Sequence, residues 1–226
     1  MRHHRRIGAA ACLLGFLASG AQALDMAFRG TFAHDDEVRF IDFAIDALSE
    51  VIIRTYSYAG GVNAAGEVIP RGGFDPSLAL FHGSGGIVTG ADNSPAADED
   101  PRTFRRYDAL MEVELGPGEY RLAITQYDNA ALGPMWDSPF TRSGMGDFTP
   151  SLTYCEADRF CDVTGVLPWN ARTGDWAVDV LNVRTAILVP APPAVPEPRT
   201  GVLALAGLAC IAAVARRCRK ESARAT

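Results

Sequence analysis

The sequence predicts an all-β domain, an antiparallel β-sandwich or jelly-roll, flanked by an N-terminal signal peptide and a C-terminal transmembrane helix. Short runs rich in β-branched and aromatic residues recur between clusters of Gly, Pro, Asn and Asp, which is typical of such folds. No long interior segment shows the spacing of apolar side chains that a helix requires. The expected strands are 27–32, 38–45, 51–57, 78–81, 109–115, 120–126 and 176–183.

Two of these runs have the pattern of a β-hairpin. Apolar residues alternate with Glu112 and Glu114 in the run 109–115, so one face of this strand is expected to be buried. A Gly-Pro-Gly turn at 116–118 then leads into the run 120–126. Because a short Gly-rich turn between alternating runs favours antiparallel pairing, we expect these two strands to be neighbours in one sheet.

Two Gly-rich segments, 58–75 and 128–150, are long for connections between strands. Long connections are commonly functional or disordered. The second segment contains Trp136, Phe140 and Phe148, whose large apolar surfaces are unfavourable in water. We therefore expect this second segment to be ordered.

Residues 1–23 have the pattern of a secretory signal peptide. Basic residues from Arg2 to Arg6 precede an apolar run too short to span a bilayer, and the segment closes on Ala21-Gln22-Ala23. Cleavage is expected after Ala23, which leaves 24–189 as the exported β-sandwich domain.

The C-terminal segment has the order of a stalk and a membrane anchor. A Pro-rich linker at 190–200 precedes an apolar run at 201–215, which is near the lower length limit for a transmembrane helix. The basic tail at 216–226 is expected to stay in the cytoplasm, so the folded domain faces the other side of the membrane.

This C-terminal segment resembles the PEP-CTERM sorting signal of exported proteins from exopolysaccharide-producing Gram-negative bacteria. The resemblance implies export by the Sec machinery and recognition by an exosortase, a membrane enzyme that processes such proteins near the triplet. Cys218 within the basic cluster departs from the pattern. The matching residues are the triplet Pro196, Glu197 and Pro198 and the basic residues Arg216, Arg217 and Arg219.

The segments "DDEVRFIDFAI" and "YDALMEVELGPGEYRLAITQYDN" resemble an uncharacterised family of exported bacterial β-sandwich proteins. They are more distantly similar to the pre-peptidase C-terminal domains of secreted proteases. These resemblances imply a binding or structural role and transfer no catalytic residue.

Charge excludes one class of partner. Between residues 24 and 195 the chain has 25 acidic residues against 12 arginines, a net charge of −13. Nucleic-acid binding needs a basic surface, so no nucleic-acid partner is expected.

Cys155 and Cys161 are the only cysteines of the expected exported domain. In an oxidising compartment they are expected to form a disulfide, worth about 2 kcal/mol for so short a loop. A metal-binding pair or a redox dithiol is disfavoured, because no histidine or second cysteine pair lies nearby and the C-x-x-C spacing is absent.

Acidic loops are the candidate metal ligands, because calcium takes six to eight oxygen ligands. The spacing matches no known calcium loop, so solvated acidic loops are the favoured interpretation and a calcium site is the alternative. The candidate ligands are Asp35, Asp36, Asp92, Asp98, Asp100 and Asp108.

Candidate catalytic residues are few. The exported domain contains His34 and His82, and the sequence around Ser84 lacks the G-x-S-x-G pattern of an exposed nucleophile. Four aromatic residues are candidates for stacking on sugar rings, but filling the ends of the core is the favoured interpretation. They are Tyr56, Tyr58, Trp136 and Trp169.

We therefore expect a non-enzymatic exported protein, held in the inner membrane facing the periplasm and then displayed at the cell surface or released into the extracellular matrix. Its expected partners are the export machinery, the exosortase and exopolysaccharide of a biofilm. A calcium-dependent carbohydrate-binding module is the alternative, and a secreted hydrolase ranks third.

Overall fold

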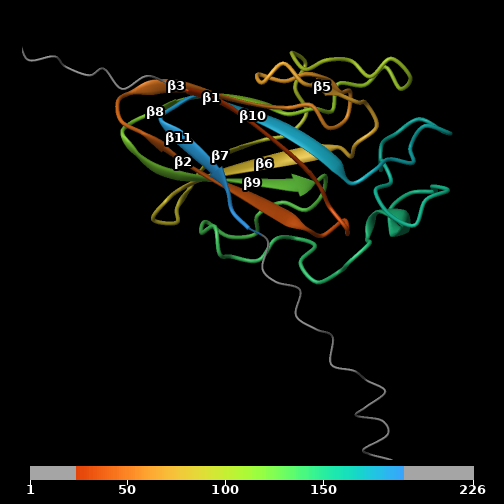
Figure 1. Ribbon diagram of the computed structural model, residues 1–226. Coiled ribbons are helices and arrows are strands. Elements are labelled where there is room, and N and C mark those ends of the chain that lie inside the picture. Colours follow the sequence, from red (N-terminus) through yellow and green to blue (C-terminus); the bar gives the residue numbers. More distant parts are fainter. Residues whose placement is uncertain (1–23, 191–226) are drawn as a thin grey trace, which may run out of the picture. The chain divides into compact units, whose positions relative to one another are not determined.

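The computed structural model describes residues 24–190. The expected signal peptide, sorting triplet, transmembrane helix and basic tail lie outside the described residues. Within 24–190, no helix is both long and apolar enough to cross a membrane. The described chain forms two antiparallel sheets with long loops gathered at one end (Figure 1).

Sheet A has the strand order β1-β10-β3-β8, and sheet B has the order β11-β2-β9-β6-β7. A separate two-stranded hairpin, β4-β5, lies in one of the long loops, and a single 3-10 turn, η1, in another. The bounds are β1 (Leu24–Thr31), β2 (Val38–Ile45), β3 (Ser49–Thr55), β4 (Gly61–Val62), β5 (Val68–Ile69), β6 (Pro76–His82), β7 (Ile87–Ala91), β8 (Leu110–Leu115), β9 (Gly118–Gln126), η1 (Thr149–Ser151), β10 (Asp175–Val183) and β11 (Thr185–Leu188).

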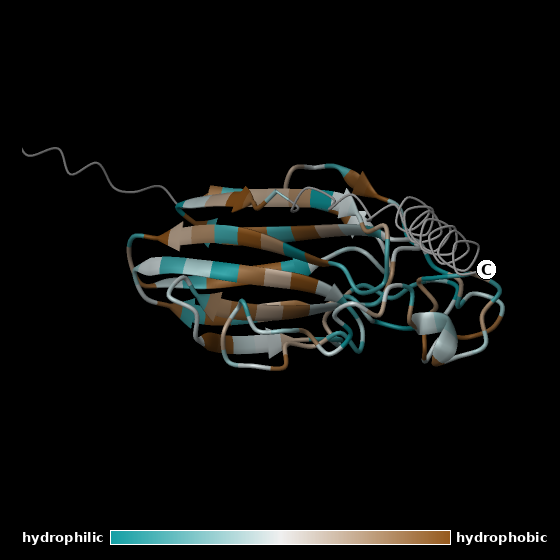
Figure 2. Cartoon of the chain, turned by 90° about the horizontal axis from the view of Figure 1, so that it is seen from below, coloured by the Kyte–Doolittle hydropathy of each residue, from teal (hydrophilic) through white to brown (hydrophobic). Residues whose placement is uncertain are grey.

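The core lies between the two sheets, where alternate side chains of each strand meet. Figure 2 shows hydrophobic and hydrophilic residues alternating along the strands, as expected where one sheet face is buried. Both sheets contribute aliphatic and aromatic side chains. Core members include Val51, Ile53, Met111, Val178 and Val180 of sheet A and Ile41, Phe43, Leu80, Leu122 and Ile124 of sheet B.

An aromatic stack extends this core toward the loop-bearing end. The ring centroids of Phe32 and Phe74 are 5.0 Å apart, and those of Phe74 and Phe160 are 5.8 Å apart. Trp176 closes the row at 6.2 Å from Phe32. Because Phe74 and Phe160 belong to loops, this stack fixes the loops to the strands.

The predicted all-β antiparallel sandwich is thus confirmed, and each of the seven expected strands is present. Four short strands, β4, β5, β7 and β11, were not predicted. The chain leaves sheet A at Val183 and enters sheet B at Thr185, so a single residue separates β10 from β11. Asn182 has a φ of 62° near this crossover.

The predicted hairpin between 109–115 and 120–126 is wrong. The β8 strand pairs with β3 in sheet A, whereas β9 pairs with β2 and β6 in sheet B. The Gly-Pro-Gly turn therefore carries the chain from one sheet to the other across the end of the sandwich. The alternation of apolar and polar residues requires only that each strand bury one face. Two strands that face one another across the core meet this requirement as well as two neighbours in one sheet do.

The segment 128–150 is ordered, as its aromatic residues predicted. It covers part of the outer face of sheet B, where Phe140 and Trp136 pack around Phe40 with centroid distances of 6.3 Å in both pairs. The guanidinium carbon of Arg121 also lies 4.1 Å from the ring centroid of Trp136.

Leu122 is fully buried at the centre of β9. We expect Leu122→Ala to lower the free energy of unfolding by about 2–5 kcal/mol, because it removes apolar contacts and leaves a cavity. Ile187→Ala is the matched control, since Ile187 is 63% exposed on the edge strand β11. Urea denaturation of both variants tests this, and equal losses would contradict the assigned core.

Candidate binding surface at the loop end of the sandwich

Three long segments meet at one end of the sandwich: 56–75, 92–109 and 149–174. In Figure 1 they occupy the same end of the molecule, beyond the ends of β3, β6 and β10. They contain little regular structure of their own, so side chains must satisfy many of their buried backbone groups.

Arg172 ties these segments together from a buried position. Its side chain is only 1% exposed. The guanidinium donates to the carbonyl oxygens of Gly73 (3.0 Å) and Tyr58 (2.7 Å) and, through both terminal nitrogens, to Oδ2 of Asp100 (3.2 Å). It also lies 3.6 Å from the ring centroid of Tyr58. One side chain therefore holds residues from all three segments.

Asp100 is the acidic centre of this network. Besides Arg172, Arg71 donates to Oδ2 at 2.6 Å, and the backbone N–H groups of Arg102 and Thr103 donate to Oδ1 at 2.8 and 3.1 Å. Burial by itself would raise the pKa of Asp100, but the hydrogen bonds from Arg71 and the two amides, together with the charge of Arg172, hold it below its usual value. The carboxylate is therefore charged and structural.

Tyr58 makes a second contact between the segments 56–75 and 149–174. Its hydroxyl donates to Oδ2 of Asp162 at 2.6 Å and lies 3.1 Å from Oγ1 of Thr103. Burial, and then the hydrogen bond to Asp162, raise the pKa of Tyr58 well above its usual value. The ring of Tyr58 is also fully buried, as the core-filling interpretation predicted.

Two further buried carboxyls lie beside this network. Asp108 accepts hydrogen bonds from Oγ1 of Thr55 (2.9 Å) and from the backbone N–H groups of Tyr58 (3.1 Å) and Ala59 (2.8 Å). Burial nevertheless raises the pKa of Asp108. Burial also raises the pKa of Asp75 well above its usual value, and the negative charges of Asp92, Asp162 and Asp108 raise it further.

The segment 149–174 is fixed by a disulfide and a buried aspartate. Cys155 and Cys161 are joined, as predicted. Asp35 accepts hydrogen bonds from the backbone N–H groups of Thr149 (2.8 Å) and Phe160 (2.7 Å).

The structure does not bring the six candidate calcium ligands together into a metal-binding group. Within 24–190, no group of three or more His, Cys, Asp or Glu side chains could hold a metal ion. The carboxylates accept hydrogen bonds from the protein's own donors instead. Asp35, Asp100 and Asp108 have the partners given above, Asp36 accepts from the Gly146 amide, Asp92 from the Ser77 hydroxyl and Asp98 from Arg54.

The two histidines lie apart from this network. Nδ1 of His34 is 3.2 Å from a carboxylate oxygen of Asp147, and the ring of His82 lies 5.5 Å from that of Tyr120. Within the described chain, neither imidazole hydrogen-bonds to a serine or cysteine.

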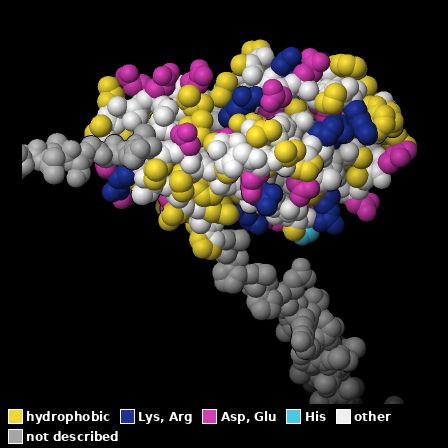
Figure 3. Space-filling model, turned by 45° about the horizontal axis from the view of Figure 1, so that its top comes forward, with side chains coloured by type: hydrophobic (Ala, Val, Ile, Leu, Met, Phe, Trp, Pro, Cys, Tyr) yellow, Lys and Arg dark blue, Asp and Glu magenta, His cyan; other side chains and the backbone are white. Residues whose placement is uncertain are grey.

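An exposed tip follows Asp100 in the chain. Phe104 is 72% exposed and has a φ of 57°, which is unusual for a bulky residue. Arg102 lies with its guanidinium carbon 4.5 Å from the ring centroid of Trp169, which is itself 41% exposed. Arg105, which follows Phe104 in the sequence, is also exposed. We call Arg102, Phe104, Arg105 and Trp169 the loop tip. Figure 3 shows hydrophobic and basic side chains side by side at this end of the molecule.

Sequence reasoning identified only part of this surface. Of the four aromatic residues considered, Tyr56 and Tyr58 are buried, Trp136 is half-buried and Trp169 is exposed. Phe104 and the neighbouring arginines were missed. The signal was present in the run "PRTFRRY" at 101–107, which concentrates three arginines and two aromatic residues within an acidic domain.

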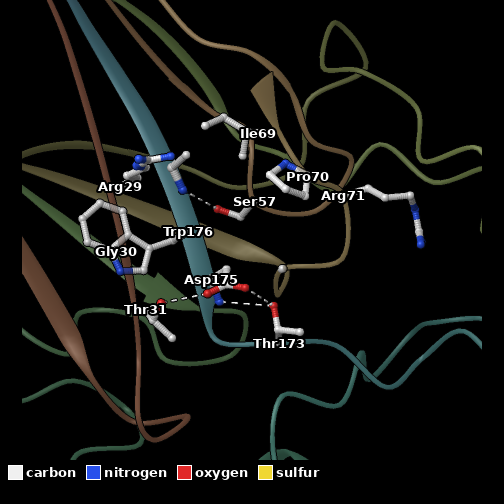
Figure 4. Close-up of a pocket in the computed structure, with 12 residues that line it drawn as sticks. Arg29, Gly30, Thr31, Ser57, Ile69, Pro70, Arg71, Thr173, Asp175 and Trp176 are labelled. Atoms are coloured by element: carbon white, nitrogen blue, oxygen red, sulfur yellow. Dashed lines mark hydrogen bonds between the residues drawn. The ribbon is translucent and has the colours of Figure 1, made fainter. Parts of the chain in front are cut away.

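A groove of about 430 Å³ lies on the outer face of sheet A, between β1, β10 and the segment that follows β5 (Figure 4). Its polar groups already have partners within the protein. The hydroxyls of Thr31 and Thr173 donate to the carboxylate of Asp175 at 2.8 and 3.0 Å, and Arg71 binds Asp100. A polar ligand would have to displace these partners, so the groove is a weaker candidate than the loop tip.

Arg172→Met tests the buried network. We expect it to lower the free energy of unfolding by about 3–5 kcal/mol, because Asp100 and two carbonyl oxygens lose their partner. Arg184→Met is the control, since its ion pair with Asp46 is half exposed and should contribute less than about 1 kcal/mol. Urea denaturation gives both values, and similar losses would contradict the role of Arg172.

Asp75→Asn tests the buried carboxyls. Because the pKa of Asp75 is raised on folding, the folded state binds its proton more tightly than the unfolded state. Stability is therefore lost as pH rises from the usual aspartate pKa through the raised one. The Asn variant should be more stable than the native chain at pH 7, and this advantage should shrink as pH falls. Urea denaturation from pH 4 to 8 measures the effect, and an advantage that does not change with pH would refute it.

Comparison with known proteins gives little further information. No protein-family model matches the chain, and no curated protein matches it. A similar solved structure is the pre-peptidase C-terminal domain of a collagenase from Bacillus anthracis. The match is 12% identical, covers 73% of this chain and 90% of that one, and has a TM-score of 0.32. Similarity this low carries no argument about function.

Proposed function

We propose that this chain is a non-enzymatic exported protein that acts at the cell surface or in the extracellular matrix by binding exopolysaccharide. In this proposal the C-terminal segment, with its Pro196-Glu197-Pro198 triplet, is the substrate of an exosortase, and the sandwich domain carries the binding surface. The resemblance of the C-terminal segment to the PEP-CTERM signal supports recognition by an exosortase. The exposed side chains of the loop tip support the binding of exopolysaccharide.

The observation that carries the proposal is the exposure of aromatic and arginine side chains on loops that the buried Arg172–Asp100 network fixes in place. Trp, Tyr and Arg are the residue types that contribute most to binding surfaces. Phe104 and Trp169 present ring surface to solvent, which is unfavourable unless a partner covers it. The buried network beneath them limits the entropy lost on binding, because Asp100 and Thr103 are already fixed.

The positions of the perturbed carboxyls favour a binding role over a hydrolytic one. A general acid or base must lie within hydrogen-bond reach of the substrate. Four described aspartates have raised pKa values. Asp75, Asp108 and Asp179 are 2%, 1% and 1% exposed, so their pKa shifts follow from burial and place no proton at the surface. Asp92 is half-buried, and its carboxylate accepts a hydrogen bond from the Ser77 hydroxyl.

The disulfide supports export. Cys155 and Cys161 close a short loop, and such bonds persist in oxidising compartments such as the periplasm and the cell exterior.

Affinity electrophoresis of the purified full chain in detergent tests the binding role. The gels contain dextran, a neutral β-glucan or polygalacturonate. We expect at least one polymer to slow the native chain and Phe104→Ala/Trp169→Ala to abolish the delay. The control Leu48→Ala/Ile187→Ala, which removes two exposed apolar residues elsewhere, should retain it. Unchanged migration of the native chain in every gel would refute the proposal, as would an equal loss in the control.

A further inference from the structure

Three arginines lie close together in the sequence of an otherwise acidic domain, two in the loop tip and one directly after it. Arg102, Arg105 and Arg106 fall within five residues and are all exposed. Arg106 is paired, since its guanidinium lies 3.4 Å from a carboxylate oxygen of Glu99. Arg102 and Arg105 have no carboxylate partner among the described residues, whereas most arginines of residues 24–190 do. These two guanidinium groups are therefore available to an external anion.

The backbone that carries these arginines is closed by hydrogen bonds. The Asp100 amide donates to the Arg105 carbonyl at 2.9 Å, and the Phe104 amide donates to the Asp100 carbonyl at 2.8 Å. The carboxylate of Asp100 holds the amides of Arg102 and Thr103 from inside. The positive φ of Phe104 persists because these contacts determine it, and strained conformations of this kind cluster at ligand sites. The tip is thus a preformed surface.

One ring of the loop tip contacts an unpaired arginine, and the other lies between the two unpaired arginines in the sequence. The guanidinium of Arg102 stacks on Trp169, which leaves its N–H edge free to donate in the plane of the group. Phe104 lies between Arg102 and Arg105 in the sequence and presents its ring to solvent. A ligand that fits this tip needs a carboxylate for the planar guanidinium and an apolar face for a ring.

The negative charge of the domain narrows the class of anionic ligand that fits the loop tip. The sequence from 24 to 195 carries a net charge of −13, so a polyanion is repelled by the domain as a whole, and the guanidinium groups of Arg102 and Arg105 offset this repulsion locally. Nucleic acid, which offers phosphates at every position, requires a broader basic surface. A polymer of sugar acids offers a carboxylate beside an apolar ring face in each residue, and it matches a small tip of two cations and two rings.

We propose that the loop tip binds an acidic polysaccharide of the polyuronate type, with Arg102 and Arg105 pairing with its carboxylates and Phe104 and Trp169 packing on its sugar rings. This inference rests on the proposed polysaccharide-binding function and names the class of its ligand.

Isothermal titration of the full chain in detergent with polygalacturonate tests it, with EDTA present so that calcium takes no part. The matched probe is the same polymer with its carboxyls methyl-esterified, which keeps the sugar ring and removes the charge. We expect polygalacturonate to bind, affinity to fall as salt is raised, and the ester to bind about tenfold more weakly or not at all.

Arg102→Gln/Arg105→Gln should weaken polygalacturonate binding about tenfold or more. The melting temperature should change little, since neither side chain has an ion-pair partner among the described residues and Arg102 loses only its exposed contact with Trp169. Arg29→Gln/Arg184→Gln removes the same charge elsewhere on the surface and should bind like the native chain. An equal loss of affinity in this control would show that binding depends on the net charge of the protein alone, and it would overturn the assignment of the tip.

The outcomes separate the two proposals. Equal binding of the acidic and esterified polymers would overturn the acidic class of ligand and leave polysaccharide binding in place. Full-strength binding by Arg102→Gln/Arg105→Gln would overturn the assigned residues. Failure of the acidic, the esterified and the neutral polymers to bind at all would refute the proposed function itself.

Discussion

The buried ion pair between Arg172 and Asp100 is the contact on which the loop-bearing half of the molecule depends. A charged pair removed from water is stable only if other hydrogen bonds satisfy each group. Here Arg172 also binds two carbonyl oxygens, and Asp100 also binds Arg71 and two amides. The pair therefore replaces the regular backbone pairing that these long segments lack, and it specifies one arrangement of three loops.

The strands provide the frame in which this pair can form. The antiparallel sheets bury their apolar faces against one another, and the row of Phe32, Phe74 and Phe160 carries that apolar contact beyond the strands into the loops. Arg172 follows Phe160 and the Cys155–Cys161 disulfide in the chain. Packing thus places the guanidinium, and the guanidinium then places Asp100, from which the exposed tip follows directly in the sequence. The same contact therefore stabilises the three loops and positions the exposed loop tip.

The sequence predicted the parts of this fold that depend on local pattern. Alternating β-branched runs located the seven main strands. Cys155 and Cys161 are the only cysteines of the expected exported domain, and this predicted their disulfide. Pattern could not tell whether β8 and β9 are neighbours or face one another, because both arrangements bury the same side chains. The partners of Arg172 lie 72 to 114 residues away in the chain, so no local spacing reveals them. Most of the aspartates that resembled metal ligands are likewise bound by groups far away in the chain, as Asp35 is by the amides of Thr149 and Phe160.

The central claim is that the buried network holds the loop tip in one conformation. Amide hydrogen exchange of the native full chain measures this most directly, residue by residue at Arg102, Thr103 and Phe104. The network predicts protection at these three amides close to that of the sheet A strand β3, because each is bound by Asp100. Exchange at the rate of an unstructured loop would contradict it, since the tip would then be mobile and its exposed rings would not form a fixed surface.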